Sequence, residues 1–553
     1  MFTRFSLSGA ALLLCADAFV IPAVLDQAPL RVPALTDLLA EKAQAVSDQI
    51  GLFPTTKKSL DTWLEEEEHI AVDRLLANIA PNGRNAQHAA PGTVIASPSK
   101  EHPNYYYQWV RDAGITMATV VDLYVADPTS ELSRTVLLPT LESYASISQK
   151  IQHTSNPSGD FTFPDLNGLG EPKFMVDGSP FTSNWGRPQR DGPALRATAL
   201  MKFMRAYNES NPGVWESRTT ASTDDWFGRL YSAELPARSI IKADLEYVAR
   251  HWPDSGFDLW EEVQGRHFFT GQAQLRALRE GAEVAAAFAD DGAAEYYRQQ
   301  ASRLESMVRN DFWDARGGYI RATRGGDAEF QRSGMDCSVL LGSIHGNALE
   351  PAYPDAAVFP PHDDAVLVTL MKFVKDQRDR YPINAQPGQE LSAFPEGDPL
   401  RPAGVGRYPE DAYDGYASPH PGAGNPWFLC TASVAEILFQ TAARVNETAT
   451  VEVSETGWEF WRGLVCPESS SDCPLSWQRK SYELGDGTGV VETALNRLKD
   501  LGDGFLAVIR KHASSDGALS EQFDRWTGYE RGATDLTWSY GAFLQAVWAR
   551  QRL

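Results

Sequence analysis

Two stretches that lie far apart in the chain each carry a glutamate among polar and aromatic residues. The first is Asp258-Leu259-Trp260-Glu261-Glu262-Val263, and the second is Leu519-Ser520-Glu521-Gln522-Phe523-Asp524. Cleavage of a glycosidic bond needs two carboxyl groups, one to protonate the leaving oxygen and one to activate water or to attack. Because 260 positions separate Glu261 from Glu521, only the fold could bring the two carboxyl groups together.

The first stretch also has a purely structural interpretation. Asp258-x-x-Glu261 fits a capping box, with Asp258 as the N-cap and Glu261 at the third position of a helix that begins there. Against this, Glu262 adds a third carboxylate within five residues, and crowding beside Trp260 would raise the pKa of the least solvated one. A glutamic acid that keeps its proton near neutral pH can act as a general acid. The local pattern leaves both interpretations open.

Two further segments, residues 105–112 and 185–193, are unusually dense in polar and aromatic side chains for loops. An Arg-Asp pair such as Arg111-Asp112 is by default a structural salt bridge. Beside Trp and Tyr, however, a guanidinium and a carboxylate can also grip the hydroxyls of one sugar ring. Residues 407–411 repeat the theme, with Arg407 beside a Tyr, a Glu and an Asp.

Other kinds of chemistry find little support. The ten His residues form no H-x-x-x-H or H-x-H pair, so a metal site is not predicted. There is no G-x-S-x-G motif, and Gly168-Leu169-Gly170 lacks the third glycine of a dinucleotide-binding loop. The net charge of −23 argues against a nucleic-acid or anionic-membrane partner, since binding phosphates needs a basic surface. Fifteen Trp residues suit the apolar faces of sugars, although many of them would simply be core.

The N-terminus has the pattern of a secretory signal. Arg4 precedes an apolar run that ends in Ala16-Asp17-Ala18, which predicts cleavage after Ala18. We expect a further processed segment over residues 19–31, a single catalytic domain over residues 32–553, and a soluble extracellular product. No later run is long and apolar enough to predict a membrane span.

Secretion also bears on the cysteines and on glycosylation. Cys466 and Cys473 flank a Pro/Ser-rich loop, so a local disulfide is predicted between them. Cys337 and Cys430 lie in apolar contexts and could equally be buried free thiols. Two sequons, at Asn208 and Asn446, predict N-glycosylation in a eukaryotic host.

Most of the chain after residue 60 reads as amphipathic helices separated by Gly/Pro-rich loops, with little strand-like alternation. Twelve helices are predicted, over residues 60–79, 107–124, 131–153, 189–208, 222–251, 262–289, 293–310, 363–380, 427–444, 449–464, 491–512 and 535–550. A run of helical hairpins with long loops favours an all-α toroidal barrel whose loops at one end build the functional site.

Together these segments resemble the glucoamylase family of inverting glycosidases, the fungal secreted enzymes in particular. The match runs in order through residues 92–99, 109–112, 185–197, 257–263, 332–334, 341–345, 407–411, 425–430 and 520–540. The resemblance implies an (α/α)6 barrel, no cofactor, and an α-1,4-glucan substrate from whose non-reducing ends β-glucose is released. We further expect a monomer without an appended starch-binding module.

Residue by residue, the resemblance implies that Glu261 is the general acid and Glu521 the catalytic base. The remaining implied residues line the pocket for the terminal glucose or support the acid: Tyr105, Trp109, Arg111, Asp112, Trp185, Asp258, Glu262 and Arg407. Two rivals stay open, namely a related exo-glycosidase acting on α-1,6-glucan or trehalose, and a non-catalytic sugar-binding homologue.

The chain departs from the family pattern in three places. Met175 and Gly178 stand where Asn and Glu are expected, and Phe523 stands where a Tyr beside the base is expected. Residues 412–424 form a longer loop than the family usually has. We expect these differences to modify the pocket rim and so the preference for chain length or linkage.

Overall fold

The computed structural model describes residues 58–211, 213–214, 228–326, 331–347, 357–386, 389–416, 423–466 and 473–553. The predicted signal and processed segment lie outside these ranges, as does part of the 412–424 loop. The described residues all belong to the compact unit that begins at Lys58.

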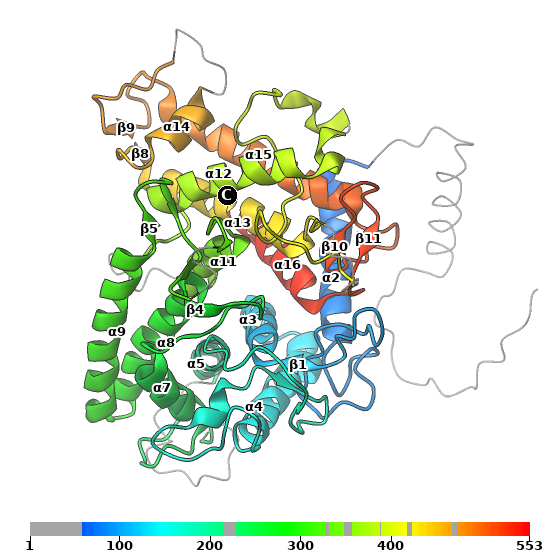
Figure 1. Ribbon diagram of the computed structural model, residues 1–553, viewed down its shortest axis with the longest axis vertical. Helices are drawn as coiled ribbons and strands as arrows, with labels where there is room; N and C mark the ends of the chain where they lie inside the picture. Colours follow the sequence, from blue (N-terminus) through cyan, green and yellow to red (C-terminus); the bar gives the residue numbers. More distant parts are fainter. Residues whose placement is uncertain are drawn as a thin grey trace, which may run out of the picture. The chain divides into compact units, whose positions relative to one another are not determined.

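Twelve helices of the described chain form two concentric rings (Figure 1). Each helix of the inner ring contacts the next helix of that ring, and the last contacts the first, which closes the ring. The inner helices are α3 (Val110–Ala126), α5 (Gly192–Ser210), α8 (Phe268–Ala287), α11 (Cys337–Gly346), α13 (Phe428–Thr448) and α16 (Thr537–Gln551). The outer helices are α2 (Leu60–Ala77), α4 (Leu138–Gln152), α7 (Ile240–His251), α9 (Asp291–Asp311), α12 (Asp364–Arg380) and α15 (Val490–His512). Outer and inner helices alternate in sequence, so the fold is an (α/α)6 barrel, as predicted.

The helices of the two rings differ in how much of their surface is buried. An inner helix such as α13 is apolar around most of its circumference and is buried along nearly its whole length, whereas the outer helix α9 keeps one charged face toward solvent. Helix α13 is also long and apolar enough to cross a membrane, but most of it is buried inside the barrel. Its apolar composition therefore reflects its place in the core.

The first and last helical hairpins are joined by side-chain hydrogen bonds. Arg74 of α2 forms an ion pair of 2.7 Å with Asp535, and the Asn78 amide donates to the Thr537 hydroxyl at 2.9 Å. Figure 1 shows α2, in blue, beside α16, in red. These contacts close the barrel between residues more than 450 positions apart.

The count of twelve barrel helices agrees with the prediction, but two members differ. Helix α11 was not predicted, because its sequence is short and apolar on every side, so it shows no 3.6-residue alternation. The helix predicted over 449–464 is instead the strand β8 (Thr450–Glu452) followed by α14 (Trp458–Val465), which is not part of the barrel. The helices predicted to begin at 222 and 262 begin at Ile240 and Phe268.

Short antiparallel strands, of two to four residues, tie the loops together. They pair as β1 (Gln108–Trp109) with β2 (Lys173–Phe174), β3 (Gly256–Phe257) with β4 (Gln264–His267) and β4 with β7 (Thr323–Arg324). The others are β5 (Trp313–Asp314) with β6 (Tyr319–Ile320), β8 with β9 (Ser481–Glu483) and β10 (Gln522–Phe523) with β11 (Glu530–Arg531). These pairings fix the backbone from which the site residues project.

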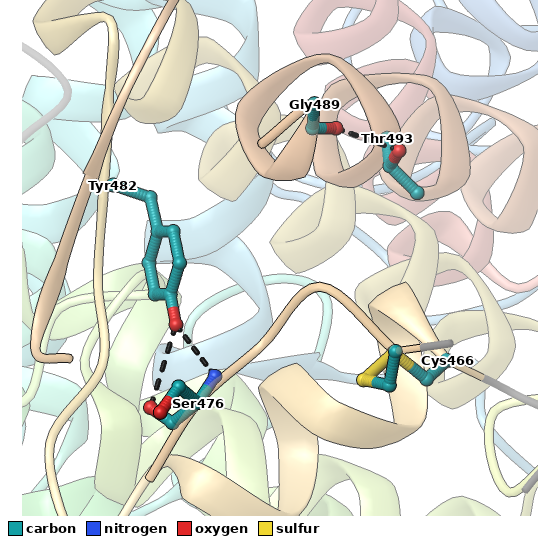
Figure 2. The surroundings of a disulfide bond; sticks show 6 residues. Cys466, Ser476, Tyr482, Gly489 and Thr493 are labelled. Carbon is teal, nitrogen blue, oxygen red and sulfur yellow. Dashed lines mark hydrogen bonds between the residues drawn. A yellow bond between two sulfur atoms is a disulfide. The ribbon is translucent and has the colours of Figure 1, made fainter. Parts of the chain in front are cut away.

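Cys466 and Cys473 form the predicted disulfide, and Cys337 and Cys430 are buried free thiols. Beyond the disulfide, the Tyr482 hydroxyl accepts a hydrogen bond of 2.7 Å from the backbone of Ser476, as Figure 2 shows. The described segment that begins at Cys473 is thus held at two points. Of the two sequon asparagines, Asn446 is exposed on α13 and Asn208 is half-buried on α5.

Candidate active site

Glu261 lies in a tight turn between β3 and β4 rather than in a helix, so the capping-box interpretation is wrong. The Asp258 carboxylate holds the turn by accepting hydrogen bonds from the backbone N–H groups of Glu262, at 2.8 Å, and Val263, at 3.0 Å. Glu261 itself has φ of +69°, a left-handed conformation that is costly for a residue with a Cβ. The turn therefore holds the glutamate in a strained position.

The Glu261 carboxylate is met by nitrogen donors from two other loops. The Trp109 indole N–H donates to Oε1 at 2.7 Å and the Gln189 amide at 2.9 Å, while Arg111 Nη2 lies 3.8 Å away. Trp109 is placed by the β1–β2 pairing and Gln189 by a bridge to Phe257. Loops that follow three different outer helices therefore converge on one carboxylate.

Glu521 lies where the β10–β11 hairpin begins and is completely buried. Burial raises the pKa of its carboxyl to about 7, although Tyr105, Arg407 and Tyr413 act in the opposite direction. Gly532 leaves room for it, since a Cβ there would lie 2.3 Å from Glu521 Oε2. Its other oxygen, Oε1, has no hydrogen-bond partner among the described residues.

The two glutamates belong to one site because the same aromatic wall links them. The Tyr105 ring lies 5.4 Å from the Trp109 ring, which reaches Glu261. The Tyr105 hydroxyl lies 3.2 Å from that of Tyr413, and both hydroxyls act to lower the pKa of the Glu521 carboxyl. Glu261 and Glu521, 260 positions apart in sequence, are thus connected through the side chains of Trp109 and Tyr105.

Arg111 and Asp112, the pair predicted to grip sugar hydroxyls, lie at the start of α3. Arg111 is buried, with Nη1 donating to Gln189 at 2.8 Å and to Asp191 at 3.1 Å. Asp112 lies 3.4 Å from Arg111 Nε, and burial raises the pKa of its carboxyl to about 6 despite that guanidinium. Asp112 Oδ2, the oxygen that faces Arg111 Nε, makes no hydrogen bond within the described chain.

On another side of the site, Glu262 is held by a cluster of charged and phenolic groups. Arg407 Nη2 donates to it at 2.9 Å and Arg332 Nη2 at 2.6 Å, and the Tyr408 hydroxyl donates a third, short hydrogen bond. Burial opposes its ionisation, but these partners outweigh burial and lower the pKa of Glu262. Glu262 is the most exposed of the three carboxylates in this segment, whereas the predicted rise in pKa concerned the least solvated one.

Asp258 lies at the base of the turn that carries Glu261. It is buried, it caps the turn through Oδ1, and its Oδ2 lies 3.7 Å from Arg332. We interpret it as a residue that shapes the turn. Glu262 and Arg407 do reach the site, with Arg407 anchored by two hydrogen bonds to Asp411, of 2.9 and 2.6 Å.

Trp185 lies in the segment beside Glu261, in an aromatic cage around a cation that sequence reasoning missed. The Lys173 ammonium lies 3.6 Å from the centroid of the Trp185 ring and 4.3 Å from that of Trp109. Burial lowers the pKa of Lys173 to about 8, although Glu261 acts in the opposite direction. Lys173 lies there because it pairs with Trp109 in the β1–β2 register. No local sequence pattern predicts that pairing.

Gln189, Tyr413 and Arg332 are further residues around the site that the predicted set omitted. Gln189 and Tyr413 lie in or beside segments singled out for their polar groups, and Arg332 lies in a segment on which the resemblance rests. Of the departures from the family pattern, Phe523 is buried and stacks on His512 at 4.2 Å, while Met175 is exposed. Within the described ranges no group of three or more His, Cys, Asp or Glu could hold a metal ion.

Several buried polar atoms around the site lack hydrogen-bond partners within the described ranges. Besides Asp112 Oδ2 and Glu521 Oε1, they include the indole nitrogens of Trp185 and Trp427. Buried polar groups are nearly always hydrogen-bonded, so these unsatisfied atoms call for an explanation, as do others elsewhere in the described chain, such as Glu67 Oε1 and the Tyr144 hydroxyl. A ligand rich in hydroxyl groups would supply both the donors and the acceptors that these atoms need.

Comparison with known proteins decides the family. The sequence pattern of glycosyl hydrolases family 15 matches residues 69–548. The chain belongs to this family. It is therefore a glycosyl hydrolase, and the paired glutamates lie in the part of the chain that the family pattern covers.

Individual relatives agree with this assignment. A glucoamylase of Saccharomycopsis fibuligera is 35% identical over 97% of this chain and 98% of its own length. An intracellular, sporulation-specific glucoamylase of Saccharomyces cerevisiae is 34% identical over 94% of this chain and 89% of its own. The solved structure of a Saccharomycopsis fibuligera glucoamylase, 35% identical, superposes with a TM-score of 0.77, covering 89% of this chain and 96% of that one.

Proposed function

We propose that this hydrolase is a glucan 1,4-alpha-glucosidase that removes glucose from the non-reducing ends of α-1,4-glucans with inversion of configuration. The observation that carries the proposal is the pair of glutamates on one aromatic wall, surrounded by buried polar atoms that lack partners among the described residues. The glucoamylases among its relatives favour the same substrate class.

In the proposed mechanism, Arg111 and Asp112 hold hydroxyls of the terminal glucose while Trp109, Tyr105 and Trp185 pack around its ring. Glu261 gives its proton to the glycosidic oxygen as the bond to the anomeric carbon breaks. A water attacks the opposite face of that carbon and gives a proton to Glu521. The accepting atom is Oε1, the oxygen without a hydrogen-bond partner in the described chain. One displacement inverts the anomeric centre and yields β-glucose.

The surroundings of Glu261 suit the charge that this step creates. A carboxylate appears on Glu261 as its proton leaves, and the N–H groups of Trp109 and Gln189 already point at Oε1. Donors fixed in place before the reaction stabilise developing charge without reorganisation. At Glu521, the neighbouring Arg407, Tyr105 and Tyr413 lower the carboxyl pKa and so favour the ionised form that a base must have, against the effect of burial.

The direct test follows the newly formed anomer by proton NMR during hydrolysis of maltotriose, with Glu261→Gln and Glu521→Gln variants alongside. Initial β-glucose that both variants nearly abolish supports the proposal. Initial α-glucose would show a retaining mechanism, and an absence of glucose would direct attention to isomaltose, trehalose or a binding role.

The two roles can be separated with α-glucosyl fluoride, whose leaving group needs far less protonation than a sugar alkoxide. Glu261→Gln should keep much of its activity on the fluoride, whereas Glu521→Gln should lose activity on both substrates. The opposite pattern would exchange the two assignments.

We also propose that the protein is secreted and monomeric, which fractionation of a host culture and light scattering would check.

A further inference from the structure

The residue before the proposed acid, Trp260, is buried, and its indole N–H is directed at one carboxylate. It donates to both oxygens of Asp336, at 2.9 Å to Oδ1 and 3.2 Å to Oδ2. The Trp260 ring also packs 5.7 Å from the Trp427 ring, and the Arg407 guanidinium lies 5.3 Å from its centroid. A large side chain next to Glu261 is thus fixed at its polar edge and on its faces.

This anchoring matters because Glu261 is strained. A non-glycine residue at φ of +69° stays there only if its surroundings over-determine the conformation. The Asp258 carboxylate restrains the peptides that follow Glu261. On the preceding side, the Trp260 indole is the large side chain that is held, and Asp336 holds it.

Asp336 is itself firmly placed. It is the N-cap of α11, and its Oδ1 accepts the backbone N–H of Ser338 at 2.7 Å. The residue is only 5% exposed, and burial raises the pKa of its carboxyl to about 7. One oxygen therefore joins the inner helix α11 to the residue beside the acid.

We propose that Asp336 is a positioning residue that directs the Glu261 carboxyl at the glycosidic oxygen by anchoring the Trp260 indole. The inference rests on the proposed function, since it assigns Asp336 a role in proton donation by Glu261. An error of about 1 Å in the placement of a reacting group can reduce the rate by roughly 100-fold. Loss of the anchor should thus slow protonation of the leaving group more than it weakens substrate binding.

The matched control is Asp363, the N-cap of α12, whose carboxylate accepts the Ala365 N–H at 2.8 Å. It is a helix-capping aspartate like Asp336, but it lies on an outer helix, away from the catalytic turn. Asp336→Leu and Asp363→Leu each remove a cap, whereas only the first also releases Trp260. Asp336→Asn keeps an acceptor oxygen at the position of Oδ1. That oxygen accepts the hydrogen bonds from the Trp260 indole and from the Ser338 backbone.

The experiment compares kcat and KM on maltotriose with kcat on α-glucosyl fluoride in the full-length protein. Asp336→Leu is expected to lower kcat on maltotriose by about 10- to 100-fold, with a loss of less than about fivefold on the fluoride. Asp336→Asn should recover most of the maltotriose activity, and Asp363→Leu should keep wild-type kcat on both substrates. Trp260→Phe, which lacks the N–H donor, should show the same dependence on the leaving group.

Equal losses on the two substrates in Asp336→Leu and Trp260→Phe would overturn the inference, because a merely structural role does not depend on the leaving group. So would an Asp363→Leu variant with the same kinetic defect. If Asp336→Leu does not fold, Trp260→Phe alone decides, since it keeps the helix cap. A wild-type protein that hydrolyses neither substrate would refute the proposed function instead.

Discussion

Replacing Trp109 by phenylalanine tests whether donors around Glu261 stabilise the charge that forms there. The variant keeps an aromatic ring against Tyr105 but loses the indole N–H that donates to Glu261 Oε1 at 2.7 Å. A hydrogen bond to a charged group contributes about 1.5–3 kcal/mol. The Gln189 amide, at 2.9 Å, remains as the second donor.

Only part of this energy affects the rate. The bond gains its full strength once Glu261 has lost its proton, and in the transition state the proton is partly transferred, so we take about half, roughly 0.8–1.5 kcal/mol. That corresponds to a fall in kcat of about 4- to 12-fold. The assay is steady-state hydrolysis of maltotriose by the Trp109→Phe variant, with kcat and KM determined separately.

Trp461 provides the control. Its indole N–H donates to Asp364 at the same distance of 2.7 Å, it is equally buried, and it lies on α14, outside the barrel. Trp461→Phe should lower stability and leave kcat unchanged. The reasoning fails if Trp109→Phe keeps kcat within about twofold of wild type, or if it changes KM alone.

Three other perturbations have expected outcomes. Tyr413→Phe removes a group that favours ionised Glu521, so the pKa of that base should rise and the acidic limb of kcat/KM against pH should move to higher pH; Tyr297→Phe, remote from the site, should leave the profile in place. Burial raises the pKa of Glu67 from 4.5 to about 8, so the native state holds a proton that the unfolded state loses above its ordinary pKa, and this contribution to stability falls as pH rises between those two values. Glu67→Gln should therefore raise the unfolding free energy at pH 8 by about 2–5 kcal/mol relative to wild type, with little difference at pH 4, as chemical denaturation at the two pH values would show. Cys466→Ser with Cys473→Ser should lower the unfolding free energy by about 2 kcal/mol, given a separation of seven residues, and leave kcat on maltotriose unchanged.

Sequence patterns predicted the elements whose chemistry is local. Helices with an apolar stripe, such as α12 and α15, were placed within one residue at both ends, because their periodicity reflects one buried face. Glu261 and Glu521 were identified from the residue types around them. Helix α11 was missed because a helix buried on every side has no stripe to detect.

The features that could not be predicted are set by packing between distant loops. The left-handed turn at Glu261 depends on hydrogen bonds to the side chain of Asp258, which the sequence also allowed as a helix cap. Lys173 sits in an aromatic cage because of its strand register opposite Trp109. Asp336 meets Trp260 across 76 positions of sequence, and no local motif encodes that contact.

The closure of the ring between α2 and α16 has a consequence for how the protein is made on the ribosome. Trp109 and Arg111 are translated more than 400 positions before Glu521 and α16, the helix that closes the barrel. Contacts of such long range form slowly and leave apolar inner helices exposed until α16 has been made. A nascent chain that stops before residue 521 holds one of the two proposed catalytic glutamates in an open arc of helices. A frameshift before that codon would thus remove both the proposed base and the closure of the ring.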